Sequence, residues 1–166
     1  MLAIQSEDKA GYKIERQAVG TNDSIIIAQA LKILESRLLI KEHFFLNPQD
    51  TEDYLKIKLA GLECEEFHCL FLDSKHALIK HECLFTGTID GASVYPREII
   101  KKALRYNAAA LIFAHNHPSG NCTPSQADIA ITNKLKDCAA LFDIRALDHI
   151  IIGGITAYSL AQNGKM

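Results

Sequence analysis

The sequence lacks the excess of positive charge that marks most nucleic-acid-binding domains. Its 166 residues contain 18 Lys and Arg against 20 Asp and Glu, which gives a formal net charge of −2. The longest basic cluster has the spacing of a solvated helix face and consists of Arg97, Lys101, Lys102 and Arg105. We therefore expect DNA binding that is weak at most, because attraction to phosphate would need a basic face.

Signals for secretion and membrane insertion are also missing. The first eight residues carry neither the basic nor the apolar segment of a signal peptide, and no stretch has the apolar length that spans a bilayer. The five cysteines form no C-x-x-C pair and no zinc-ribbon spacing. They are typical of reduced thiols in a cytoplasmic protein, the compartment that we expect, with Cys122 as a bystander in a loop.

No internal repeat or low-complexity tract divides the chain. Its composition, 48% hydrophobic and 23% charged residues, is that of a globular domain that can bury a core without cross-links. We expect residues 1–45 to form an N-terminal extension with one amphipathic helix, over residues 22–40, and residues 46–166 to form the main domain. The apolar stripe of that helix, with Ile27 and Leu31, is expected to pack in a core, and the alternative is a homodimer face.

Strand-like and helix-like segments alternate along the main domain. A turn at residues 47–50 is expected to precede a helix over residues 51–60 that ends at Gly61. Apolar runs bounded by turn residues predict strands at 67–72, 77–85, 108–114, 144–152 and 155–160, and helices at 96–106 and from residue 124. Gly153 and Gly154 are expected to form the last hairpin turn. The fold class is therefore α/β, with a single mixed sheet flanked by helices.

The most informative tract is His115-Asn116-His117-Pro118-Ser119-Gly120. Histidines at positions i and i+2 project to the same side of an extended segment, so a strand end can offer two nitrogen ligands to one metal ion. The apolar run before them predicts a buried strand, which Pro118 and Gly120 then stop. A chance pair is the alternative, because the chain has seven histidines.

A helix start follows this tract and adds two polar side chains. Thr123 is expected as the N-cap, Pro124 as the first helical residue and Gln126 as the partner that completes a capping box. Ser125 and Asp128 are then three residues apart on one helix face. Two imidazoles, one carboxylate and an open fourth position are typical of a catalytic zinc site, and a chance pair of histidines stays open as the alternative.

At these residues the sequence resembles the RadC family, whose core is a JAB1/MPN-type (JAMM) metalloprotease-like domain. The JAMM pattern is an upstream Glu, His-x-His, seven residues, Ser, two residues and Asp, and the chain matches it with His115, His117, Ser125 and Asp128. Further RadC-like segments are Leu70-Phe71-Leu72-Asp73, Phe85-Thr86-Gly87-Thr88, Pro96-Arg97-Glu98 and Leu147-Asp148-His149-Ile150-Ile151. Longer RadC proteins carry an N-terminal helix-hairpin-helix region. The chain has no comparable Gly-rich hairpin motif, so it resembles the short, single-domain members.

The resemblance implies an MPN/JAB-like fold of three layers and one Zn²⁺ per chain. His115, His117 and Asp128 would hold the ion, with water as the fourth ligand. The RadC-type pattern Glu-x-Phe implies that Glu65 is the base, which would take a proton from that water and return it to the leaving amine. Ser125 would help to stabilise the oxyanion.

The position of the base depends on strand alternation. Glu65 is expected on the side of Phe67 and Glu66 on the opposite side, so Glu66 is the alternative base if the register differs by one residue. Asn116 and His149 are candidates for groups that support the metal ligands, and a hydrogen-bonded structural role is the alternative for His149.

The expected function is zinc-dependent hydrolysis of a peptide or isopeptide bond in a peptide or protein substrate. Eukaryotic deubiquitinases of the superfamily usually have Ser or Thr where Asn116 stands, which argues against a ubiquitin-type substrate. No Lys or Arg between Ala108 and Ala130 is placed to clamp a phosphate. A DNA-repair-associated nucleic-acid-binding or nuclease protein, and a non-catalytic metal-binding interaction module, remain the alternatives. An HNH nuclease spreads its motif over a ββα unit, and a zinc deaminase needs His-x-Glu and Cys-x-x-Cys, which the chain lacks.

Overall fold

The computed structural model describes residues 25, 26, 29, 48–87 and 94–166. The chain divides into two compact units, residues 1–40 and 41–166. In the first unit, Ile25, Ile26 and Gln29 are helical. The rest of the predicted helix over residues 22–40, with its apolar stripe and homodimer face, lies outside the described residues. The candidate site belongs to the second unit.

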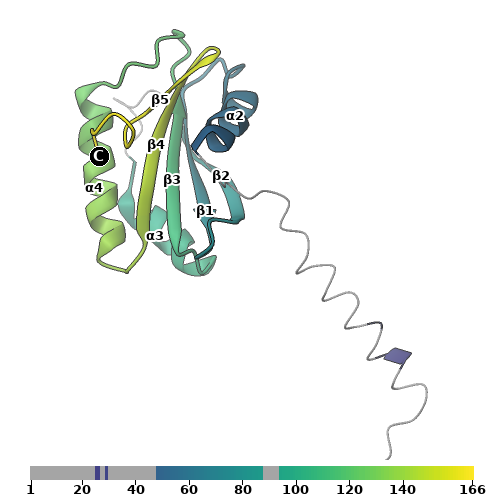
Figure 1. The fold of residues 1–166 in the computed structure, drawn as a ribbon. Coiled ribbons are helices and arrows are strands. Elements are labelled where there is room, and N and C mark those ends of the chain that lie inside the picture. The colour runs from purple at the N-terminus through teal and green to yellow at the C-terminus, as the bar shows by residue number, and fades with distance from the viewer. Residues whose placement is uncertain (1–24, 27–28, 30–47, 88–93) are drawn as a thin grey trace, which may run out of the picture. The chain divides into compact units, whose positions relative to one another are not determined.

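A single five-stranded sheet forms the centre of the second unit (Figure 1). Its strands are β1 (Glu66–Leu72), β2 (Leu78–Thr86), β3 (Ala110–Asn116), β4 (Arg145–Gly153) and β5 (Thr156–Ser159). Their order across the sheet is β2-β1-β3-β4-β5. The β3–β4 pair is parallel and the other neighbouring pairs are antiparallel. The sheet is therefore mixed, as predicted.

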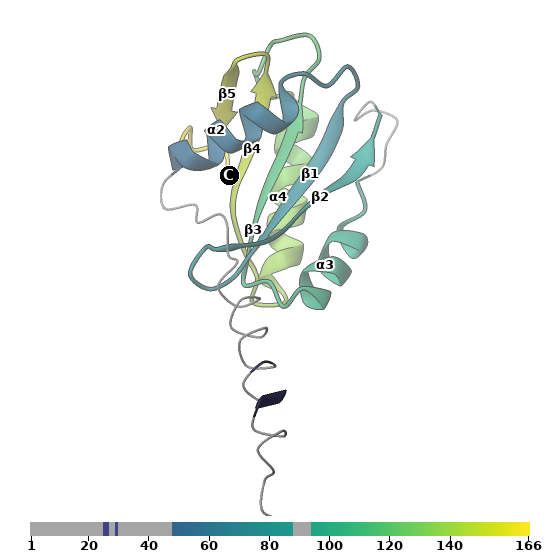
Figure 2. The same ribbon diagram turned by 90° about the vertical axis from the view of Figure 1, so that its right-hand side faces the viewer.

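Three helices cover the two faces of this sheet. They are α2 (Pro48–Leu59), α3 (Pro96–Arg105) and α4 (Gln126–Ala140). Figure 2 shows α2 on the near side of the sheet and α4 behind it. The predicted α/β fold with helices flanking one mixed sheet is confirmed.

Side chains of β1 alternate between two buried clusters. Phe67, Cys69 and Phe71 pack in the cluster that includes residues of α3 and α4. Leu70 and Leu72 pack in the cluster that includes residues of α2. Each fully buried aliphatic or aromatic side chain contributes about 1.5–3 kcal/mol, so the two clusters fix which way every residue of β1 faces.

Three local predictions need correction. Helix α2 begins at Pro48, so the turn predicted at residues 47–50 is wrong over 48–50, because proline suits the first helical turn. Strand β3 runs to Asn116 rather than ending at residue 114, since its pairing with β4 continues that far. The last hairpin turns at Gly154 and Ile155, because Gly153 still pairs with Thr156.

The predicted end of α3 is confirmed. Tyr106 caps the helix, and Asn107 follows with a φ of 51°, in the left-handed region that asparagine tolerates. Within the part of the chain that the structure describes, no helix has the length and apolarity to cross a lipid bilayer.

Candidate metal and catalytic site

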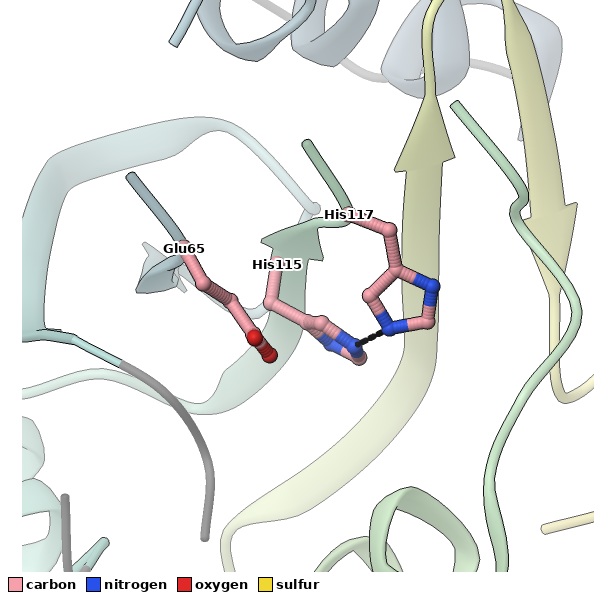
Figure 3. Close-up of side chains that lie close together, drawn as sticks. All are labelled: Glu65, His115 and His117. Atoms are coloured by element: carbon pink, nitrogen blue, oxygen red, sulfur yellow. Dashed lines mark hydrogen bonds between the residues drawn. The ribbon is translucent and has the colours of Figure 1, made fainter. Parts of the chain in front are cut away.

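The end of β3 brings together the two histidines of the central motif. His115 lies in the strand and is fully buried, and His117 follows the strand with 19% of its side chain exposed. Their Nε2 atoms are 3.0 Å apart (Figure 3). Asp128 reaches the pair from α4, with Oδ1 3.4 Å from His115 Nε2 and Oδ2 3.7 Å from His117 Nε2. The three predicted ligands therefore converge on one point.

Ser125, not Thr123, is the N-cap of α4. Its Oγ accepts a hydrogen bond from the backbone N–H of Asp128 (3.1 Å), and its own backbone N–H donates to Asp128 Oδ2 (2.7 Å). The predicted capping box of Thr123 and Gln126 is therefore replaced by one between Ser125 and Asp128. This capping box fixes the Asp128 carboxylate at the helix start, where the helix dipole favours a negative charge. Ser125 itself is exposed to solvent.

The second nitrogen of His117 is held by the following loop. His117 Nδ1 lies 2.6 Å from the carbonyl oxygen of Asn121. A carbonyl oxygen only accepts, so Nδ1 must carry the proton. In the neutral ring, Nε2 is then left with a lone pair that points into the site.

The second nitrogen of His115 is held by a buried chain of hydrogen bonds. The Thr132 hydroxyl donates to the carbonyl oxygen of Asp128 (2.5 Å), so Thr132 Oγ1 accepts from His149 Nδ1 (2.5 Å). His149 Nε2 is then an acceptor, and His115 Nδ1 donates to it (2.8 Å). Burial, reinforced by His115 and His117, holds the pKa of His149 well below its usual value, so this ring is neutral. His115 Nε2 therefore also keeps its lone pair.

These proton positions leave two lone pairs facing each other across 3.0 Å. A hydrogen bond between them would require one ring to carry protons on both nitrogens. Burial, reinforced by His117, lowers the pKa of His115 to about 4, although the Asp128 carboxylate favours the protonated ring and works against this shift. The contact is unfavourable in a neutral pair and becomes favourable when a cation lies between the nitrogens.

The Asp128 carboxylate gives an independent sign of a cation. Its Oδ1 atom is buried and has no hydrogen-bond partner among the described residues, which is costly for a charged oxygen. A tetrahedral ion with bonds of about 2.0–2.2 Å separates its ligand atoms by about 3.3–3.6 Å. Asp128 Oδ1 lies 3.4 Å from His115 Nε2 and Oδ2 lies 3.7 Å from His117 Nε2, both close to that range, and the two Nε2 atoms lie nearer to each other, at 3.0 Å. The donor set fits a divalent cation.

Glu65 lies beside the two histidines. A carboxylate oxygen of Glu65 and one nitrogen of each ring all lie within 4.8 Å of one another (Figure 3). Glu66 faces the other side of the sheet, where its Oε2 lies 2.9 Å from His68 Nε2. The structure thus brings Glu65 to the predicted ligands and does not bring Glu66 there.

Asn116 fixes the segment that carries Glu65. Its side chain is buried, Oδ1 accepts from the backbone N–H of Glu66 (2.9 Å), and Nδ2 donates to the carbonyl oxygens of Cys64 (2.9 Å) and Leu62 (3.4 Å). All three contacts are to backbone flanking Glu65. Asn116 therefore connects the histidine motif to the position of the predicted base.

Two further positions were missed by sequence reasoning. Thr132 follows Asp128 by one helical turn, and this i, i+4 spacing was the available signal. Gly153 has no comparable local signal. A Cβ atom there would lie 2.6 Å from Cys122 N and from Gly120 O, so only glycine lets the loop that carries Asn121 approach β4.

Comparison with known proteins supports the resemblance found in the sequence. The family model of the RadC-like JAB domain matches residues 45–165. A "UPF0758 protein" of Vibrio cholerae is 52% identical over 139 residues, which cover 84% of this chain and 87% of the relative. The UPF0758 protein YfjY of Escherichia coli is 49% identical over 140 residues, covering 84% and 88%. The UPF0758 protein PSHAa2643 of Pseudoalteromonas translucida is 56% identical over 124 residues, 75% of this chain and 55% of that protein.

Proposed function

The chain belongs to the RadC-like JAB domain family, and on that premise we propose that it is a zinc-dependent metallohydrolase that cleaves a peptide or isopeptide bond. One observation carries the proposal. Two imidazole lone pairs converge with a buried carboxylate oxygen that has no hydrogen-bond partner among the residues that the structure describes. Two nitrogen ligands and one oxygen ligand with an open position suit a catalytic zinc ion.

His115, His117 and Asp128 would hold the ion. When bound there, zinc lowers the pKa of a water ligand to about 7 and polarises a carbonyl group. The chain's own residues keep the two Nε2 atoms unprotonated through the hydrogen bonds at Nδ1.

Glu65 and Ser125 are the groups that would handle the substrate. Glu65 would accept a proton from the attacking water and deliver it to the leaving amine, and its carboxylate lies within 4.8 Å of a nitrogen of each ring. Ser125 Oγ accepts from Asp128 N–H, and the hydrogen of the same hydroxyl is donated to the developing oxyanion. Ser125 is exposed, so a substrate can reach it.

The charges around the site favour an amide over a phosphodiester. The candidate ligands include one carboxylate side chain and two imidazole nitrogens, a set that suits a neutral carbonyl group. Phosphoryl transfer more often uses two metals about 3.5–4 Å apart, held by several carboxylates. A peptide or protein is therefore the proposed partner, and DNA binding is expected to be weak. A homodimer through the helix predicted over residues 22–40 is a further proposal.

The test combines metal analysis with substrate screens. Purified protein is expected to bind zinc at the His115–His117–Asp128 site and to hydrolyse members of a broad peptide library. His117→Ala should lose that zinc and the activity, and Glu65→Gln should lose the activity but keep the zinc. His76→Asn is the matched control, because His76 lies in the β1–β2 turn with a φ of 63°, which asparagine tolerates. Zinc-dependent nuclease activity that disappears in His117→Ala, without peptidase activity, would overturn the proposal.

A further inference from the structure

A second group of metal-ligating side chains lies on the opposite face of the sheet. Glu66 and His68 are two residues apart on β1, and Cys83 on β2 pairs directly with His68. Alternation along β1 and the cross-strand pairing place the three side chains on the face covered by α2. One ligand atom from each lies within 4.8 Å of the other two.

The imidazole of His68 is held for this position by a relay of hydrogen bonds. His68 is buried, its Nδ1 lies 3.0 Å from His81 Nε2, and His81 Nδ1 lies 2.9 Å from the Tyr54 hydroxyl. A metal-ligating histidine typically has its other nitrogen held in this way. The His68 Nε2 atom faces Glu66 Oε2 at 2.9 Å.

The relay is complete with either arrangement of protons. If Tyr54 donates to His81, then His81 donates to His68 and His68 Nε2 donates to Glu66. If His68 Nδ1 donates to His81, then His81 Nδ1 donates to Tyr54, and His68 Nε2 presents a lone pair. A cation can therefore replace the Nε2 proton without leaving a buried nitrogen unpaired. Burial lowers the pKa of both His68 and His81, the latter to about 4, so both rings are neutral at neutral pH.

We propose that Glu66, His68 and Cys83 form a second binding site for a divalent transition-metal ion of the zinc type. Imidazole, thiolate and carboxylate are the three kinds of ligand that zinc accepts in proteins. Cys83 is exposed and Glu66 is half-buried, so water can complete the coordination from the solvent side.

This second site would stabilise the pairing of the edge strand. The β1–β2 register shifts between Phe67 and His68, and such an irregularity interrupts the hydrogen-bond ladder. An ion held by Glu66 and His68 on one strand and Cys83 on the other spans this shift. The second site lies on the other face of the sheet from the proposed hydrolytic centre, because Glu65, just before β1, and Glu66, its first residue, belong to separate groups of side chains.

The test counts zinc in the full chain after the resident metal has been removed. Wild type is expected to bind two zinc ions per chain, and Cys83→Ser and His117→Ala are each expected to bind one. The double variant should bind none with comparable affinity. Loss of zinc in His117→Ala but not in Cys83→Ser would overturn the second site and leave the proposed hydrolytic centre standing. The reverse pattern would support the second site and contradict the first.

Cobalt(II) gives a second readout that does not depend on counting. In the His117→Ala background, bound cobalt should show the near-ultraviolet charge-transfer absorption of a thiolate ligand. Cys83→Ser should abolish that absorption, and His68→Gln should weaken cobalt binding at least tenfold. The controls Cys122→Ser and Cys138→Ser should change neither the absorption nor the affinity for cobalt. Circular dichroism of each variant checks that the sheet has formed. Absence of the absorption in a folded His117→Ala protein would overturn the proposal.

Discussion

Replacement of Thr132 by valine tests the buried relay behind His115. Valine has nearly the same shape as threonine but lacks the hydroxyl that binds His149 Nδ1 and the Asp128 carbonyl oxygen, both at 2.5 Å. Thr132 and His149 are both fully buried, so water cannot replace the lost partner. The proton on His149 is then no longer fixed at Nδ1. When it moves to Nε2, His149 can no longer accept the hydrogen bond from His115 Nδ1.

Two magnitudes follow from this loss. A buried donor left without a partner costs about 1–3 kcal/mol, so the free energy of unfolding of the metal-free protein should fall by that amount. Loss of a group that orients a metal-ligating histidine typically weakens metal binding about 10- to 100-fold, or about 1.4–2.8 kcal/mol. Both effects are expected in Thr132→Val, because one hydroxyl serves the helix and the relay.

The assay measures zinc affinity by competition with a chromophoric chelator and stability by urea unfolding of the metal-free protein. The affinity is read at the His115–His117–Asp128 site in a Cys83→Ser background. Thr132→Ser is the control, because it restores the hydroxyl and should keep wild-type affinity. If Thr132→Val lost stability but bound zinc within twofold of wild type, the hydroxyl would have no role in orienting His115, and the assignment of protons along the relay would be refuted.

Four further predictions concern the surroundings of the site. Gly153→Ala should lower the free energy of unfolding by about 1–3 kcal/mol, because the new Cβ would lie 2.6 Å from loop backbone. It should also weaken zinc binding, measured by chelator competition. Gly61→Ala is the control and should change neither quantity, because Gly61 has open space around it. Asn116→Ala should lower kcat of peptide hydrolysis by up to about 100-fold and leave the zinc content unchanged. The reason is that the segment carrying Glu65 loses its hydrogen bonds to the Asn116 side chain. Loss of zinc in this variant would contradict that role. The free energy of unfolding of the metal-free protein, measured in urea, should fall as pH falls from about 6.5 to about 4. The reason is that His115 takes up a proton in the unfolded state at a higher pH than in the folded state. A stability that does not change over this pH range would contradict the lowered pKa of His115. DNA binding by the full chain should be weak and abolished by moderate salt in a filter-binding assay, and tight binding that survives salt would favour a nucleic-acid role.

Features that depend on local periodicity could be predicted from the sequence. Histidines at i and i+2 after an apolar run face the same way in any strand, so His115 and His117 were predicted as a pair from spacing alone. The same alternation separated Glu65 from Glu66 before the sheet was known. The order of strands and helices predicted the α/β class, because each apolar run needs a partner face to cover it.

The start of α4 was predicted two residues too early. Local spacing predicted a capping box that begins at Thr123, whereas the structure has one that begins at Ser125. The capping box at Ser125 holds the Asp128 carboxylate at the start of α4, where it lies close to His115 at the end of β3.

The contacts that hold the site in place were decided by tertiary structure alone. Thr132 meets His149 across 17 residues, and Asn116 reaches the backbone of Cys64 across 52. Gly153 is required because a loop packs against it. Such contacts join residues that neither helix nor strand periodicity relates, so no spacing in the sequence encodes them. The Thr132–His149 contact forms when α4 packs on the sheet, and the other two form where β3 and β4 meet neighbouring loop segments.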